Sequence, residues 1–535
     1  MNRAWSGQVA ASSPVEGALL CSAGSPVLRS AQVHEEPAEG SSRRGLPNGR
    51  TSSNQPADRS TDPRRPTRLL AILGPTRMMA ILGPTRMLAI LGAASLAPYL
   101  YALYLGDLRQ HTTGFLVAFF AAFALYARVT VLALRSGAFS RRALALSFAL
   151  AVAFQALLLF IPPTLSDDMY RYVWDGRVQA QGISPYRYPP DAAELQALRD
   201  AEIWPVMNRR SAVTVYPPGA QAAFALLWRA APDSVRWFQG AMAAGGLLAG
   251  GLLVGLLRTL GRSPARVLIY LWSPLLAFET AHAAHVDGLI LPLLVGAWWA
   301  RVRERDTLVG LLLGLATAIK LYPILLLPAL WRPRHPQGRW RLPLAFGLSL
   351  GACYLPYVWT SGAGVLGYLP HYFGERFNLG LAGLLLPGLE YLGLDPNRSL
   401  LVLMLAVLAL LGLGLVLRPA ASGESAVRRC IWLMGAFTLL TQNLFSWYLL
   451  WLLPLVAIFL RPGRLLGLRA GGWTGWWLFC GLAGLSYTFF IQWRPVPMAL
   501  WAQFAPLYGL LLWDAGRCLW RRRCGWQDVR QAMAR

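Results

Sequence analysis

Residues 166–190 read SDDMYRYVWDGRVQAQGISPYRYPP and belong to a polar region, residues 164–215, that follows a long apolar segment. This region contains seven of the chain's 25 acidic residues. Its spacing predicts a helix with two neighbouring faces of aromatic and charged side chains. The abrupt change in composition is typical of a chain that leaves a lipid bilayer at this point. The two faces consist of Tyr170, Trp174 and Arg177, and of Arg171, Asp175 and Val178.

The composition of the whole chain also indicates a membrane protein. Of its 535 residues, 55% are hydrophobic and 14% are charged, whereas about a quarter are charged in a soluble protein. A DNA-binding protein could match the net charge of +25, but it would not contain repeated apolar stretches of about 15–25 residues. Six cysteines without zinc-ligand spacing indicate neither a disulfide scaffold nor a structural metal site. We therefore predict an all-α polytopic membrane protein.

The arginine clusters indicate the direction of the first apolar segments, because Lys and Arg accumulate in cytoplasmic loops. The loop between the second and third segments contains Arg135, Arg141 and Arg142 and is expected in the cytoplasm. The polar region 164–215 is therefore expected on the outer side. The three segments are residues 87–105, 113–134 and 143–163.

The remaining segments continue this alternation, giving about 14 crossings with both termini in the cytoplasm. Residues 306–331 have arginines on both sides, so they are predicted to turn round, with Lys320 near the outer apex. Residues 216–228 and 379–394 are expected to lie along the membrane surface. Further spans are predicted at 235–258, 266–281, 286–301, 342–360, 399–418, 428–444, 446–461, 472–492 and 497–516.

The ends of the chain differ from the apolar part. Residues 1–65 are polar and lack apolar periodicity, which predicts a disordered cytoplasmic tail. Residues 66–92 contain three copies of a nonapeptide close to PTRxxAILG, which fits no repeat fold and leads into the first span. Residues 517–535 are predicted to form a basic cytoplasmic tail.

Several ionisable and aromatic side chains are predicted on the outer side, and each is a candidate site residue because a charge in a membrane is costly. Lys320, the only lysine of the chain, suits a phosphate or carboxylate, or could pair with a nearby acid. Asp167 or Asp168 could act as a general base, or both could form a solvated pair at a helix start. The alternatives elsewhere are an ion pair for Asp175 and Arg177, a helix cap for His285 and Asp287, and an aromatic belt for Trp447 and Tyr448.

Five motifs make the chain resemble the GT-C superfamily of membrane glycosyltransferases, and within it the bacterial polyprenol-phosphate-mannose-dependent mannosyltransferases. The resemblance covers residues 87–516 and implies a GT-C-like helical bundle with a long first catalytic outer loop. It also implies a donor on polyprenyl phosphate, inversion at the anomeric carbon and a catalytic base, here Asp167 with Asp168 as the alternative. The motifs are DDMYRYVWDGRVQAQGISPY from Asp167, YPPGAQ from Tyr216, HVDG from His285, GLATAIKLYP from Gly314 and WYLLWLLP from Trp447.

This resemblance and the outer-face residues together predict a site. Charge develops on the donor phosphate as it leaves, so a cation is expected beside it. The phosphate-binding candidates are Lys320, Arg171, His285 and Arg376. The sugar- or acceptor-binding candidates are Tyr170, Trp174, Asp175, Arg177, Asp287, Tyr322, Trp447 and Tyr448. No metal-ligand set is recognisable, no cofactor is expected with certainty, and members of the superfamily differ in whether they use a divalent cation.

The predicted function is transfer of a hexose, with mannose as the family expectation, on the outer side of a bacterial inner membrane. The expected partners are the lipid-linked donor, a glycolipid, polysaccharide or other hydroxyl acceptor, and the bilayer, but no nucleic acid. The alternative is a transporter or flippase for a lipid-linked sugar. A transporter would show paired repeats and charges deeper in the bundle.

Overall fold

The structure is a computed structural model that describes residues 75–137, 139–372 and 375–533. The described residues from Pro84 onward belong to one compact unit, and residues 75–83 belong to a second one. The predicted tail 1–65 and the first copy of the nonapeptide lie outside the described residues. Within the described ranges the regular secondary structure is helical apart from the short strand β1 (Pro462–Leu465), which confirms the predicted all-α class.

Seven helical segments of the described chain are long and apolar enough to cross a bilayer, for which about 20 residues are needed. They support the prediction of a membrane protein. The total of about 14 crossings stays a prediction, because the helices at the other predicted spans do not combine the length and the hydropathy of these seven. The seven segments lie in α2 (Pro75–Leu105), α3 (Thr112–Arg135), α4 (Arg141–Leu159), α7 (Val235–Thr259), α13 (Gly338–Ser361) with η5 (Gly362–Leu366), α16 (Pro396–Leu417), and α19 (Gly472–Leu482) with η7 (Ala483–Thr488) and α20 (Phe489–Gln492).

The predicted span at 266–281 is interrupted in the structure. It consists of short turns that end in a π-helical turn, η3 (Phe278–His282), a feature often found at functional positions. The last helix, α21 (Pro497–Met533), continues beyond the predicted span into the residues expected to form a tail. The remaining elements are η2 (Pro264–Arg266), α8 (Val267–Leu271), α9 (Pro274–Ala277), α12 (Leu327–Leu330), α14 (Leu369–Tyr372), α15 (Leu381–Tyr391), α17 (Gly423–Leu440), η6 (Ser446–Leu449) and α18 (Leu452–Phe459).

Residues 306–331 turn round at Lys320, as the arginine pattern predicts. Helix α11 (Asp306–Ile319) ends one residue before Lys320, whose backbone is extended, and η4 (Tyr322–Leu326) begins the return. The return brings Arg332 back to Asp306, with 2.6 Å between Nη2 and Oδ2. Lys320 is therefore at the apex of the hairpin, and Asp306 is at the opposite end of α11.

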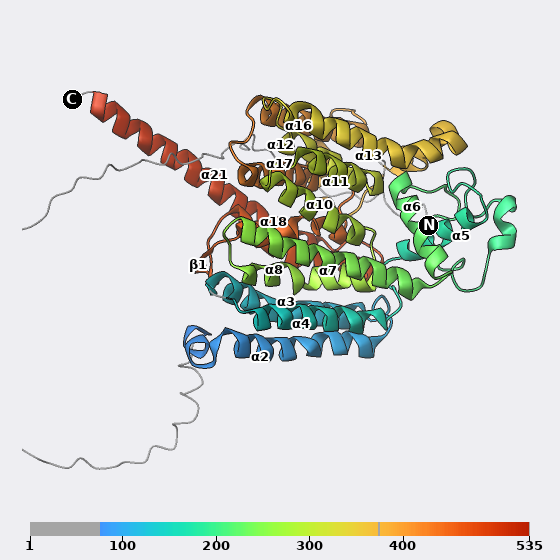
Figure 1. Cartoon of the computed structure of the whole chain (residues 1–535), viewed down its shortest axis with the longest axis horizontal. Helices are drawn as coiled ribbons and strands as arrows, with labels where there is room; N and C mark the ends of the chain where they lie inside the picture. Colours follow the sequence, from blue (N-terminus) through green and yellow to red (C-terminus); the bar gives the residue numbers. More distant parts are fainter. Residues whose placement is uncertain (1–74, 138, 373–374, 534–535) are drawn as a thin grey trace, which may run out of the picture. The chain divides into compact units, whose positions relative to one another are not determined.

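Residues 164–230, which we call the cap, lie at one end of the long helices, whereas β1 lies at the other end (Figure 1). The cap contains α5 (Asp168–Ala180), η1 (Ala193–Leu198) and α6 (Pro218–Ala230), the last of which corresponds to the predicted surface helix. Helices α5 and α6 touch at Gly176, where a Cβ would lie 2.8 Å from the carbonyl oxygen of Phe224. Their contact buries a small apolar core that includes Tyr172 and Trp174.

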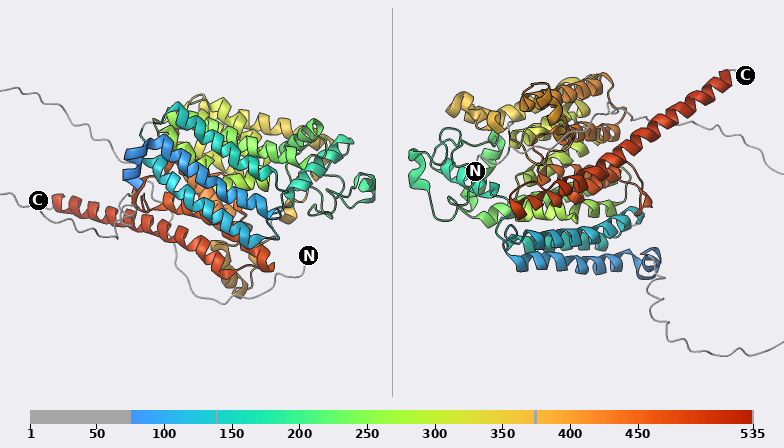
Figure 2. Two further views of the ribbon diagram at one scale, coloured as in Figure 1. Left: turned by 90° about the horizontal axis from the view of Figure 1, so that it is seen from below. Right: turned by 180° about the vertical axis from the view of Figure 1, so that it is seen from behind.

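The long helices run alongside one another, with α2, α3 and α4 together on one flank (Figure 2). Helices α7 and α10 (Asp287–Val302) approach closely because glycines lie at their contact. A Cβ on Gly288 would lie 2.4 Å from the Met242 carbonyl oxygen, and one on Gly245 would lie 2.3 Å from the Gly288 carbonyl oxygen. Backbone contact therefore sets the position of Asp287, the first residue of α10.

Candidate active site

An ion pair joins α10 and α11 at the end of the bundle beneath the cap, which we call the site end. Lys320 Nζ lies 2.7 Å from Asp287 Oδ2, and Trp451 Nε1 donates to Asp287 Oδ1 at 2.9 Å. Asp287 is completely buried. Each charge suits its helix end, since Asp287 begins α10 and Lys320 directly follows α11. Two residues predicted for different parts of the substrate are therefore paired in the structure.

Tyrosine rings surround the Lys320 ammonium group. Its Nζ lies 4.7 Å from the ring centre of Tyr448 and 5.4 Å from that of Tyr322. The Tyr322 hydroxyl donates to the Tyr448 hydroxyl at 2.6 Å, and Tyr372 and Tyr448 share a hydrogen bond of 2.7 Å. Burial raises the pKa of Tyr372, so its hydroxyl stays protonated at neutral pH. The three hydroxyls form a continuous chain from the lysine towards the cap.

The carboxylate of Asp168 lies at the cap end of this chain. It accepts a hydrogen bond of 2.7 Å from Asn208 Nδ2, and its charge raises the pKa of Tyr372 further, in addition to the effect of burial. Arg209 lies over the Tyr372 ring at 5.7 Å and forms a two-pronged ion pair with Glu375. This ion pair joins the loop that contains Arg209 to the loop that follows α14, next to Tyr372.

The neighbouring carboxylate, Asp167, has different surroundings. Arg109 Nη2, from the loop between α2 and α3, lies 2.5 Å from Asp167 Oδ1. The Asp167 side chain is 36% exposed. It lies near Tyr170, whose pKa is raised by burial and then by the charge of Asp167. The two adjacent aspartates therefore contact different groups, as expected for consecutive residues at a helix start.

A buried polar chain supports the first turn of α5. Ser166 Oγ accepts a hydrogen bond of 3.3 Å from the backbone nitrogen of Asp168 and lies 3.1 Å from His285 Nε2. His285 Nδ1 lies 3.0 Å from Glu279 Oε2, and the Tyr487 hydroxyl donates to Glu279 Oε1 at 2.9 Å. His285 and Glu279 are almost completely buried. The predicted phosphate ligand His285 is thus held between a carboxylate and a serine of the cap.

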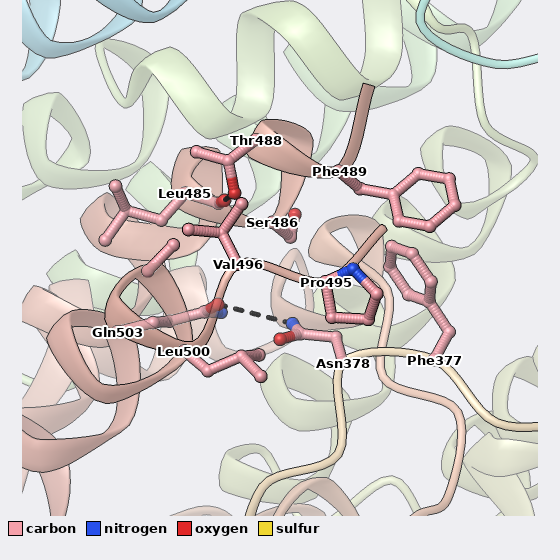
Figure 3. Close-up of a pocket in the computed structure, with 11 residues that line it drawn as sticks. Phe377, Asn378, Leu485, Ser486, Thr488, Phe489, Pro495, Val496, Leu500 and Gln503 are labelled. Carbon is pink, nitrogen blue, oxygen red and sulfur yellow. Dashed lines mark hydrogen bonds between the residues drawn. The ribbon is translucent and has the colours of Figure 1, made fainter. Parts of the chain in front are cut away.

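Stacked rings lead from His285 along the site end. The centre-to-centre distances are 3.7 Å from His285 to Trp447, 4.3 Å from Trp447 to Phe445, and 4.7 Å from Phe445 to Phe377. Phe377 borders a cavity of about 20 Å³, in which Asn378 donates to Gln503 at 3.3 Å (Figure 3). This volume suits about one water molecule and is too small for a sugar.

Four of the predicted sugar-binding or phosphate-binding residues make contacts within the cap, namely Arg171, Trp174, Asp175 and Arg177. Arg171 binds Asp175 at 2.8 Å and donates to the carbonyl oxygens of residues 209 and 212. Arg177 binds Asp233 at 2.8 Å and lies over the buried Trp174 ring at 5.7 Å. Their charged groups are therefore already engaged within the protein. Arg376, the fourth phosphate-binding candidate, donates to Asn397 at 2.7 Å.

The structure brings together one subset of the predicted residues and adds others that the sequence did not single out, among them Tyr372, Arg109, Arg209, Glu279 and Asn208. Arg109 and Arg209 carried no distinct signal, because the polar region 164–215 alone contains six arginines. Glu279 carried one, as an acid within an apolar stretch. Asn208 carried none. The predicted residues at the site end are Asp167, Asp168, His285, Asp287, Lys320, Tyr322, Trp447 and Tyr448, with Tyr170 beside Asp167.

The donor set at the site end suits phosphate and hydroxyl groups. Among the described residues, no three His, Cys, Asp or Glu side chains come together as metal ligands would. Cationic and hydroxyl donors predominate around Tyr448, and they can bind phosphate oxygens directly.

Comparison with known proteins supports this interpretation. Residues 76–332 match the family model described as alpha-(1->6)-mannopyranosyltransferase, N-terminal domain, and this range includes Asp167, Asp287 and Lys320. This match fits the predicted resemblance to a mannosyltransferase family and supports mannosyl transfer. None of the curated proteins and none of the solved structures matches the chain.

Proposed function

We propose that the protein transfers mannose from a polyprenyl-phosphate donor to an acceptor hydroxyl, on the extracytoplasmic side of a bacterial plasma membrane. One observation carries the proposal: Lys320, Asp287 and Asp168 of the first long loop meet around Tyr372 and Tyr448 at one end of an apolar bundle. The match to the mannosyltransferase family model supports the sugar and the reaction class. A lipid-linked donor can reach such a site from the bilayer.

In the proposed reaction the acceptor oxygen attacks the anomeric carbon from the side opposite the phosphate, so the configuration inverts. The bond between C1 and the phosphate oxygen breaks, and its electron pair stays on the phosphate. The acceptor proton passes to an aspartate. The products are the glycosylated acceptor and polyprenyl phosphate, which carries one more negative charge than the diester it came from.

Lys320 is proposed to stabilise this additional charge. An ammonium group has three donors, and in the described chain one of them is used by Asp287. The remaining donors can turn to phosphate oxygens while Asp287 keeps the nitrogen in place. The Tyr448 and Tyr372 hydroxyls lie between Lys320 and Asp168 and can add hydrogen bonds to the sugar or phosphate.

Asp167 is the proposed base, with Asp168 as the alternative. The exposure of Asp167 supports this order, because an acceptor must reach the carboxylate. Asp168 is tied to Asn208 and faces the tyrosines, which suits contact with the donor. His285 and Glu279 are proposed as positioning residues, since they act through Ser166 on the first turn of α5.

The test is transfer in proteoliposomes that contain polyprenyl-phosphate mannose and a lipid extract from the host. Asp167→Asn should lower transfer by about 10²–10⁴-fold without loss of donor binding, the range expected when a general base is removed. The matched control is Asp191→Asn, which changes an exposed carboxylate of the same loop.

The outcomes separate the candidate roles. Loss of transfer in Asp168→Asn instead would make Asp168 the base. Full transfer in both variants would contradict the proposed site. Movement of donor across the bilayer by the wild type, without any transfer, would favour a flippase over the enzyme.

A further inference from the structure

A large cavity lies at the end of α10 and α11 opposite the site end. Its volume is about 1140 Å³, and it lies between α7, α10, α11 and the segment that leads into α13. Helix α10 runs from Asp287 at the site end to Val302 at the cavity, and α11 runs back from Asp306 towards Lys320. The cavity and the candidate active site are therefore at opposite ends of α10 and α11.

The walls of this cavity are apolar along the helices. Leu248 of α7 is 59% exposed and Leu308 of α11 is 45% exposed, so the surface between the helices is open to the surroundings. In a membrane protein, such a surface is covered by lipid chains or by another helix. Further wall residues are Leu252, Leu293, Leu311 and Leu312.

The rim of the cavity is positively charged. Four arginines and two acids line it, and both acids are engaged by one arginine, since Arg332 lies 3.0 Å from Glu304 and 2.6 Å from Asp306. Within the described part of the chain, the other three rim arginines have no acid partner at ion-pair distance. These three are Arg303, Arg305 and Arg341.

We propose that this cavity binds an anionic glycerophospholipid, with an acyl chain against the leucines and the phosphate at the three arginines. An apolar wall together with unpaired cations matches a molecule that is apolar at one end and negatively charged at the other. A free phosphate would leave the leucine wall unused, and a zwitterionic lipid would not neutralise the arginines. The proposal does not depend on the proposed transfer reaction.

The experiment is photocrosslinking of the full chain in nanodiscs of phosphatidylcholine. The probe is phosphatidylglycerol with a diazirine on its acyl chain, and labelled peptides are mapped by mass spectrometry. We expect at least fivefold more label on α10 and α11 from this probe than from phosphatidylcholine with the same diazirine chain. Equal labelling by the two lipids would overturn the proposal.

Variants test the two parts of the site. The triple change Arg303→Gln, Arg305→Gln and Arg341→Gln should lower labelling to the phosphatidylcholine level. The matched control removes three exposed arginines elsewhere, with Arg135→Gln, Arg142→Gln and Arg464→Gln, and should label like the wild type. Unchanged labelling in the first triple variant would contradict the role of its arginines. Leu308→Trp, which narrows the apolar part, should reduce labelling by both lipids.

Competition with the wild type needs no variant. Unlabelled phosphatidylglycerol should displace the probe, whereas inorganic phosphate at the same concentration should leave labelling within about twofold. Equal displacement by inorganic phosphate would show that the charged rim alone binds the ligand, and would overturn the assignment to a lipid.

Discussion

The two ends of the α10–α11 pair contain the same kind of contact in different surroundings. At the site end, Asp287 of α10 binds Lys320 after α11 at 2.7 Å. At the opposite end, Arg301 of α10 lies 3.2 Å from Asp306 of α11. At both ends the acid begins a helix and the cation lies near a helix C-terminus, so each charge is favoured by the helix dipole.

The difference lies in what else binds these charges. Asp306 is also bound by Arg332, which in turn binds Glu304, so the far end has several cations and acids that can replace one another. Lys320 has one acid partner in the described chain, Asp287, and is otherwise faced by tyrosine rings. We infer that the far end serves mainly to hold the helices, while the site end keeps a cation that is available to a ligand.

Among the changes that compare the two ends, neutralising the acid at the site end should have the largest effect. Asp287→Asn removes the counter-ion that holds Lys320, so we expect transfer to fall by about 100-fold, similar to the loss of one stabilising donor at a reacting centre. Asp306→Asn should leave kcat/KM within about threefold. Both are measured in proteoliposomes beside thermal unfolding curves. Equal losses of transfer in the two variants would remove the distinction between the ends.

A smaller effect is expected when the cation is kept but its shape changes. Lys320→Arg retains the charge, but the planar guanidinium does not fit a site built around a compact ammonium group, so transfer should fall by about tenfold. Lys320→Met should retain less activity than Lys320→Arg. The reverse order would show that the charge of residue 320 is not used in the reaction.

The hydroxyl chain should contribute less than the charges. Tyr448→Phe removes the central hydroxyl between Tyr322 and Tyr372, and we expect about a fivefold loss in kcat/KM with a destabilisation of about 1–3 kcal/mol. Tyr391→Phe, a change of an exposed tyrosine outside the site, is the control. An unchanged kcat/KM in Tyr448→Phe would show that the three linked tyrosine hydroxyls take no part in the reaction.

The smallest effect is expected from removing divalent cations. Because Lys320 already supplies positive charge at the site end, transfer after treatment with EDTA should stay within about twofold of the untreated value. Loss of transfer that is restored by added Mg²⁺ or Mn²⁺ would mean that Lys320 does not act alone on the phosphate.

Apolar patterns and arginine clusters predicted the main helices and the hairpin at Lys320, because both signals are local in the sequence. They did not predict the broken turns between residues 264 and 286, where packing interrupts the helix. The candidate site residues were named one by one, and Lys320 was expected either to suit a phosphate or to pair with an acid that was not specified. Asp287 and Lys320 are 33 positions apart, and their contact depends on how α10 packs on α11.

In the cap, too, the sequence did not determine the role of individual residues, because those roles depend on packing. The sequence left Asp175 with either ligand binding or an ion pair with Arg177, whereas the ion pair in the structure joins Arg171 and Asp175. In the structure they bind each other and nearby carbonyl oxygens, because α5 is buried against the rest of the cap. The sequence contains no information on burial at that scale.

Close backbone contacts at both ends of α10 constrain the number of residues in this helix. At one end Gly288 lies against Met242, and at the other a Cβ on Gly423 of α17 would lie 2.6 Å from the Cα of Val302. A helix turns by about 100° for each residue. One inserted residue between Gly288 and Arg301 would therefore rotate one end against the other, so that Asp287 and Arg301 could not both face α11. The number of residues between these two charges is under tighter constraint than the identity of the side chains between them.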